Sequence, residues 1–141
     1  MRSVEKKVEI LYQIALSIGN SLNLEHMLLD SLRTMLRSLN GTAIQVMAST
    51  PTKQSSAIAD GYESMAAIPR RIASSRCFEP LLAEVRAGAD LPCTLQDGET
   101  WEYAFELPDI GVLLLRKRLN LLDHDMLISL QQLMIKLSLA I

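Results

Sequence analysis

The chain has 141 residues, of which 49% are hydrophobic, 21% are charged and 4% are aromatic, and its formal net charge is −2. This length suits one domain with an aliphatic core, and the near-neutral charge gives no electrostatic reason to expect nucleic-acid binding. No apolar run approaches the ~20 residues that span a bilayer, and the N-terminus lacks the apolar segment of a signal peptide. We therefore expect a cytoplasmic protein without membrane insertion. Its two cysteines are too few for a disulfide framework, so we expect reduced thiols.

The first predicted helix covers residues 4–18 and carries apolar residues at alternating steps of four and three. This heptad spacing is typical of a helix that packs along a partner helix. A second apolar set, which includes Ile10 and Ile14, lies on the adjacent face. We therefore expect one face to pack on the domain and the other on a second copy, although one broad core-facing stripe explains the spacing equally well. The heptad positions are Val4, Val8, Leu11, Ala15, Ile18 and Leu22.

A second helix is predicted over residues 24–39, between two clear boundary signals. Asn23 is a favourable N-cap, and the pair Asn40 and Gly41 tolerates the left-handed conformation that often ends a helix. The next residues, 42–48, predict a strand.

The middle of the chain gives weaker signals. Residues 55–59 are the predicted hairpin partner of the first strand, although their small side chains make a poor strand pattern. Residues 65–87 have helical character that Pro69 and Pro80 interrupt, which predicts two short helices.

The clearest hairpin signal joins strands at residues 91–96 and 100–107 through Asp97 and Gly98. Aromatic residues alternate with acidic or small ones along the second of these strands, so one of its faces is aromatic. Such a face either walls a pocket for a planar ligand or forms core beneath a helix. The aromatic residues are Trp101, Tyr103 and Phe105.

The last predicted strand, residues 110–115, is an almost unbroken apolar run, which suits a strand in the middle of a sheet with both faces covered. Three basic residues, Arg116 to Arg118, are expected to end it in water. A helix then covers residues 123–141 and is apolar on more than one side. It stops at Ile141 without a capping residue or glycine, which predicts an output domain beyond it. Helices at both ends of an antiparallel sheet of five to six strands make an α+β fold.

Both ends of the chain resemble a known family, the GAF domain. The N-terminal stretch LYQIALSIGNSLNLEHMLLDSLRTMLRSLNGTAIQVM resembles the first two helices and first strand of that family. The C-terminal stretch GVLLLRKRLNLLDHDMLISLQQLMIKLSLAI resembles its last strand, acidic elbow and closing helix. The resemblance covers residues 1–48 and 100–141. A PAS-like fold is the alternative, and the two long N-terminal helices favour GAF.

The resemblance implies a single GAF-like domain over residues 1–141, with the first, second and last helices on one face of the sheet. It also implies a small-molecule pocket on the other face, under the middle segment. GAF-like domains regulate larger signalling proteins, and we expect a sensor histidine kinase. The first helix (4–18) and last helix (123–141) would pair in a homodimer and transmit the signal. The interface residues expected in the last helix are Met126, Leu130, Leu133 and Leu137.

The residues that encode ligand chemistry in this family are missing. The chain has no Asn-Lys-Phe-Asp-Glu signature of cyclic-nucleotide binding, no bilin-anchoring Cys-His pair and no closely grouped cysteines. A ligand-free structural dimerisation module is therefore the alternative function. If a ligand binds, the expected pocket residues are Tyr62, Met65, Phe78, Trp101, Tyr103 and Phe105.

Catalytic and metal chemistry find little support. His26 and His124 fall at predicted helix starts, and no cluster has metal-ligand spacing, so we expect no metal and no cofactor. Cys77 and Cys93 would form a redox pair only if they met in space beside positive charge. There is no phosphate-binding loop and no nucleophile elbow. We therefore expect a protein that is not an enzyme, with a small thiol-redox protein as the least favoured alternative.

Overall fold

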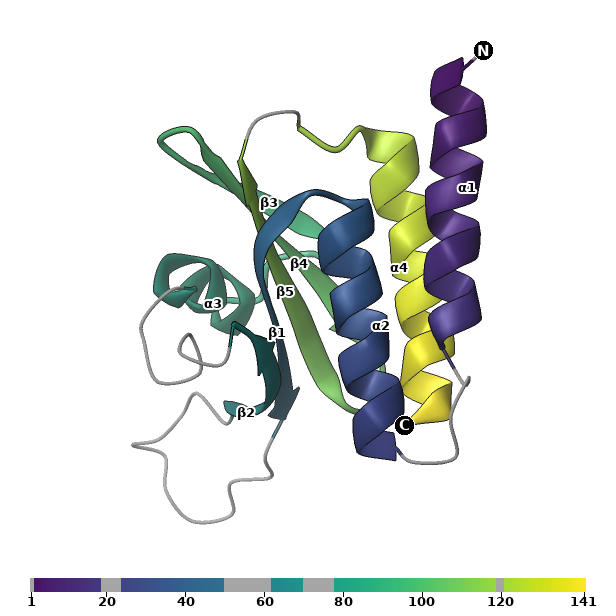
Figure 1. The fold of residues 1–141 in the computed structure, drawn as a ribbon. Helices are drawn as coiled ribbons and strands as arrows, with labels where there is room; N and C mark the ends of the chain where they lie inside the picture. The colour runs from purple at the N-terminus through teal and green to yellow at the C-terminus, as the bar shows by residue number, and fades with distance from the viewer. Residues whose placement is uncertain (1, 19–23, 50–61, 70–77, 119–120) are drawn as a thin grey trace.

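The computed structural model describes residues 2–18, 24–49, 62–69, 78–118 and 121–141. Figure 1 shows a central sheet with three helices on one side and a short helix on the other. The helices are α1 (Arg2–Ser17), α2 (Leu24–Ser38), α3 (Glu79–Arg86) and α4 (His124–Ala140). The strands are β1 (Gly41–Ser49), β2 (Tyr62–Ile68), β3 (Cys93–Asp97), β4 (Thr100–Leu107) and β5 (Gly111–Arg118).

The five strands form one antiparallel sheet in the order β2-β1-β5-β4-β3, so β5 is the central strand. Its residues 112–115 are all buried, which confirms the prediction of a mid-sheet strand covered on both faces. The α+β class and the antiparallel sheet are also confirmed, with five strands in the described residues.

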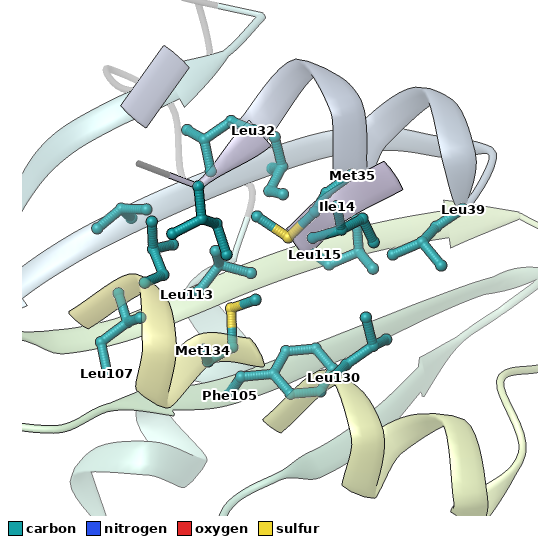
Figure 2. Packing of buried hydrophobic residues seen from close by; sticks show 14 of the residues in the cluster. Ile14, Leu32, Met35, Leu39, Phe105, Leu107, Leu113, Leu115, Leu130 and Met134 are labelled. Atoms are coloured by element: carbon teal, nitrogen blue, oxygen red, sulfur yellow. The ribbon is translucent and has the colours of Figure 1, made fainter. Parts of the chain in front are cut away.

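The larger core layer lies between the sheet and the helices α1, α2 and α4. Every second side chain of β4 and β5 on this face packs against α2 and α4 (Figure 2). The strands contribute Phe105, Leu113 and Leu115, and the helices contribute Leu32, Met35, Leu130 and Met134. Helix α1 packs on α2 and α4 and contributes the fully buried Ile14. The core is aliphatic and rich in methionine, as the scarcity of aromatic residues predicts.

A smaller core layer lies on the opposite face of the sheet, under α3. Here Phe78, Leu81 and Leu82 pack on small and aliphatic strand residues. Three of those strand residues are alanines, which lets the short helix approach the sheet closely. The strand residues are Ala43, Ala67, Ala104, Val112 and Leu114.

Three turns have the geometry that their residues predict. Asn40 ends α2 with a positive φ of 55°, and Gly98 closes the β3–β4 hairpin at 64°. Asp109, between β4 and β5, has a φ of 65°. Gly41 lies in a tightly packed place, since an added Cβ would lie 2.9 Å from methyl carbons of both Leu36 and Leu115 and would make these side chains shift.

The middle of the chain differs from its prediction. Residues 65–68 belong to strand β2, which pairs with β1, and the only helix in described residues 65–87 is α3. The sequence there, Ser64 to Ala67, favours a helix locally, but hydrogen bonding to β1 overrides this weak preference. The expected hairpin partner at residues 55–59 lies outside the described residues.

The basic end of β5 also differs from its prediction. The strand continues through Arg118 instead of ending before Arg116, because β1 and β4 both extend far enough to pair with it. Lys117 is only 5% exposed, and Arg116 is partly buried, so only Arg118 is a surface residue.

Helix α4 is attached to the rest of the domain at its start and at its middle. Asp123 is the N-cap, as predicted, and its side chain accepts a hydrogen bond from the backbone N–H of Met126 at 2.8 Å. The Asp123 carboxylate also pairs with Lys7 of α1.

At the middle of α4, the Gln131 amide accepts a hydrogen bond from the backbone N–H of Glu106 and donates one to its carbonyl oxygen, both at 2.8 Å. Strand β3 pairs with β4 only as far as Ala104, so Gln131 satisfies backbone groups that β3 does not reach.

We expect Gln131→Ala to lower the free energy of unfolding by about 1 kcal/mol, because two partly solvated hydrogen bonds to the sheet are lost. Gln132→Ala is the matched control, since Gln132 is exposed on the same helix. Urea denaturation monitored by circular dichroism measures both. Equal stability of the two variants would show that the Gln131 contact does not hold α4 on the sheet.

Candidate functional site

The most distinctive surface of the molecule is apolar and lies on α1 and α4. Among the described residues, eight large hydrophobic side chains are exposed, and seven of them belong to α1, to α4 or to the segment that leads into α4. We call these seven the outer helical face. They are Val8, Tyr12, Leu16, Leu121, Ile128, Ile135 and Leu139.

On α1, the exposed residues form a row at steps of four. Val8, Tyr12 and Leu16 are 60%, 60% and 51% exposed, while Ile14 on the opposite side of the helix is fully buried. The flank of α1 that contains Ile10 lines a hollow of about 300 Å³ together with the end of α2. Successive residues of a helix are 100° apart, so Val8 and Tyr12 lie on the flank of α1 opposite the one that borders α2. This part of the row is therefore on the α4 side of the helix.

On α4, Ile128, Ile135 and Leu139 lie opposite the buried side of the helix and are 44%, 43% and 83% exposed. Helices α1 and α4 run side by side in the same direction (Figure 1), and the pair between Lys7 and Asp123 joins their N-terminal parts. The exposed rows therefore lie on two adjacent helices, on the sides of α1 and α4 that do not face the core.

The interface predicted from the sequence has to be corrected. In α4, Met126, Leu130 and Leu137 are 5%, 2% and 0% exposed and form part of the chain's own core, against which Leu133 packs. In α1, Ile18 is buried, Leu11 packs against the core and Ala15 is half-buried. Only Val8 is well exposed; the side chain of Val4 and the whole of Leu22 lie outside what the structure describes. Leu11, Ala15 and Ile18 face inward because α1 packs on two helices, α2 and α4, which requires a wide apolar stripe.

The predicted pocket residues do not come together. Tyr103 and Phe105 are buried beneath the helices, with Trp101 beside them, whereas Phe78 lies in the core layer on the other face of the sheet. Met65 is 40% exposed on β2, and the side chain of Tyr62 is outside the described part. As the sequence predicts, the aromatic residues of β4 lie on one face of the strand. In the structure this face belongs to the core beneath the helices.

The face that the GAF resemblance assigns to a ligand is filled, in its described part, by side chains of the chain itself. Phe78 and Leu81 are 4% and 0% exposed against the sheet. A surface hollow of about 410 Å³ lies elsewhere, at the end of α2. It is lined by Arg33, Leu36, Arg37, Asn40 and Gly41.

A buried ion pair joins the neighbouring strands β4 and β5. It lies on the same face of the sheet as α3, beyond the apolar layer. The Arg116 guanidinium donates to the carboxylate of Glu102 from Nε at 2.8 Å and lies within 2.6 Å of it through Nη2. The exposed Asp97 is 3.8 Å from the same guanidinium. Glu102 is 1% exposed, and burial raises the pKa of its carboxyl although Arg116 acts to lower it.

Lys117 is a buried charge on the helix side of the same strand. It lies between Gly41 and Trp101 in the sheet, and no ion pair joins it to another described residue. Burial lowers the pKa of its amine.

Redox and metal chemistry gain no support from the described residues. Cys93 is half-buried, and burial together with the nearby Glu84 raises the pKa of its thiol, which disfavours the reactive thiolate. Cys77 lies outside the described part, so its distance from Cys93 is not defined. Within residues that are described, no three His, Cys, Asp or Glu side chains gather as metal ligands would. None of the described helices has the length and apolar character needed to cross a membrane.

No protein-family model matches the chain, and no curated protein matches it significantly in sequence. The outer helical face lies on α1 and α4, the helices for which the sequence predicts an interface, and Val8 is the one residue common to this face and the predicted set. Two signals for it are present in the sequence: steps of four from Val8 to Leu16, and steps of seven from Leu121 through Ile128 to Ile135.

We expect Arg116→Met to lower the free energy of unfolding by about 3 kcal/mol, because it leaves the buried Glu102 carboxylate without its partner. The double variant Arg116→Met/Glu102→Leu should recover most of this loss, since an apolar pair of similar volume replaces the ion pair. Chemical denaturation of the two variants and of Glu102→Leu completes the cycle. A double variant that is no more stable than Arg116→Met would contradict a desolvated, mutually dependent pair.

The lowered pKa of Lys117 predicts how stability depends on pH. The unfolded chain binds the proton up to the usual pKa of 10.5, whereas the folded chain releases it earlier, so the contribution of Lys117 to stability rises as the pH increases toward 10.5. Lys117→Met removes this group while keeping its length. The native chain should therefore gain unfolding free energy relative to the variant as the pH is raised from 7 toward 10.5. A difference that stays constant would mean that the amine is not desolvated.

Proposed function

We propose that this chain is a GAF-like regulatory domain of a larger cytoplasmic signalling protein, and that it acts as a homodimer formed through the outer helical face. A sensor histidine kinase is the class of parent protein that we favour, with an output domain after Ile141. The observation that carries the homodimer is the concentration of exposed large hydrophobic side chains on α1 and α4.

The outer helical face is unfavourable in water. Exposed apolar side chains gathered on two adjacent helices mark an interaction surface, whereas single exposed ones are normal. Full burial of a Val, Leu or Ile side chain contributes about 1.5–3 kcal/mol, and side chains that start half-exposed contribute a corresponding fraction. Six such residues and Tyr12 from each copy therefore favour association against the entropy that it costs.

The arrangement of the elements supports the GAF-like part of the proposal. Helices α1, α2 and α4 lie on one face of the antiparallel sheet, and the middle segment contributes α3 to the other face (Figure 1). This is the arrangement that the resemblance of both chain ends implies. The proposed dimer surface lies on the first and last helices, on which the resemblance implies pairing.

The second candidate is a structural dimerisation module without a ligand. It is favoured by the filling of the α3-side face with Phe78, Leu81 and Leu82. Both candidates share the dimer and differ in ligand binding. In the sensing domain, the change that is transmitted is a shift in the population of dimer arrangements, which binding of a ligand or partner would bias.

We expect Tyr12→Glu and Ile128→Glu each to convert the dimer to a monomer that keeps its fold, as judged by circular dichroism; its melting temperature should lose the stabilisation that the dimer provides. Both side chains are exposed in the single chain, so the charge is desolvated only in the dimer. Gln13→Glu is the matched control: it adds the same charge one position along α1, on the flank next to α2, and should leave the dimer intact. Leu130→Glu is unsuitable, because Leu130 belongs to the core and its loss would unfold the chain.

Native mass spectrometry of the purified protein measures the oligomeric state and any retained small molecule together. A dimer with added mass supports ligand sensing, and a dimer of bare chains that also gains no thermal stability from metabolite screens supports the structural module. A native chain that stays monomeric at high micromolar concentration contradicts both candidates.

A further inference from the structure

We propose that the end of helix α2 holds a binding site for a phosphate-bearing small molecule, with Arg33 and Arg37 as the residues that contact the phosphate. The site borders the flank of α1 opposite Val8 and Tyr12, so the inference goes beyond the proposed homodimer and does not depend on it. It follows from two surface hollows, from the charges that line them and from a buried amine beside them.

Two hollows meet at the end of α2. One, of about 410 Å³, is lined by α2 and by Gly41, the first residue of β1, and the other, of about 300 Å³, is lined by α1 and the end of α2. Arg37 and Asn40 border both hollows. Small-molecule sites in proteins have volumes of about 300–1,000 Å³, so this end of α2 has room for a phosphate group and the molecule that carries it. We call the two hollows the α2-end hollows.

The charged side chains that line the α2-end hollows are mostly basic. Among the described lining residues, Lys6, Arg33 and Arg37 contribute three positive charges, and Glu9 contributes one negative charge. The excess of two positive charges stands on a chain whose net charge is −2. A phosphomonoester carries a charge of about −1.5 to −2 at neutral pH, so it matches this local excess.

The basic side chains are available to a ligand. No ion pair joins Lys6 or Arg37 to another described residue. Arg33 pairs with Asp30 at 3.5 Å, but both side chains are more than half exposed, and such a surface pair is weak. Arg33 and Arg37 are four residues apart and therefore lie on the same side of α2. Guanidinium groups donate two parallel hydrogen bonds to phosphate oxygens, which makes arginine the preferred residue for this contact.

The helix dipole offers a simpler reason for one of these charges. A basic residue in the last turn of a helix complements the negative end of the dipole, and Arg37 lies in the last turn of α2. This reason does not extend to Lys6, which belongs to α1. It also does not explain why Lys6 and Arg37 border the same hollow.

A buried amine lies beside the larger hollow. Lys117 pairs with Gly41 in the sheet, so their Cα atoms are about 5 Å apart, and Gly41 borders the hollow. Residues paired in this way point to the same face of the sheet, which at Gly41 is the face that Leu36 of α2 covers. Lys117 is 5% exposed and has no ion pair with another described residue. An anion in the hollow gives this buried charge a neighbour of opposite sign.

Titration of the isotope-labelled chain with sodium pyrophosphate, followed by NMR, tests the site. Sodium chloride at matched ionic strength is the reference, because it reports general screening. We expect saturable shifts at millimolar pyrophosphate or below, centred on the backbone amides of residues 36–42 and 6–13. Arg37→Gln should weaken binding about tenfold, since charge-assisted hydrogen bonds are lost. Lys136→Gln is the matched control: it removes the same charge from an exposed position on α4 and should leave the affinity within about twofold.

Three outcomes overturn the inference. The first is the absence of saturable shifts at these residues with pyrophosphate. The second is an equal loss of affinity in Arg37→Gln and Lys136→Gln, which indicates attraction to the overall charge alone. The third is binding to vesicles that contain phosphatidic acid without binding to pyrophosphate, since the ligand is then a membrane surface. Native mass spectrometry of the same chain decides the proposed homodimer separately.

Discussion

The fold depends on the burial of β5 on both of its faces. This strand has hydrogen-bonded neighbours on each side, and its side chains alternate between two apolar layers. Val112 and Leu114 pack toward α3, whereas Leu113 and Leu115 pack toward the three longer helices. A central strand of this kind needs cover on both faces, so the helices at the two ends of the chain must return to one face while the middle of the chain supplies the other.

The outer helical face is a consequence of placing α1, α2 and α4 on the same face of the sheet. Helix α4 uses one side to cover β4, and α1 uses one side to pack on α2 and α4, yet both helices carry more apolar residues than these contacts need. The surplus lies on the solvent side of each helix. A chain that only had to fold would gain by having polar residues there, since burial in the monomer does not reward the apolar ones. This surplus is the observation on which the proposed homodimer rests.

Much of the fold was readable from the sequence because its signals are local and strong. The apolar run of β5, the Asp97–Gly98 hairpin and the Asp123 cap each define an element without help from distant residues. The middle segment was misread as helix because Met65, Ala66 and Ala67 favour a helix until β1 pairs with them. The interface was misplaced for a similar reason. A step pattern shows that a helix has an apolar side, but only the packing of α1 and α4 decides which of two neighbouring apolar sets faces inward.

The contact between Gln131 and Glu106 has a consequence for how copies of the chain can associate. Beyond Ala104, the outer backbone groups of β4 have no partner from β3, and such groups are a template for adding a strand from another molecule. The side-chain amide of Gln131 imitates a peptide group and occupies both the donor and the acceptor of Glu106. Growth of the sheet from that point is blocked by a helix. The side chain of Gln131 thereby protects this edge of the domain against the open-ended addition of strands.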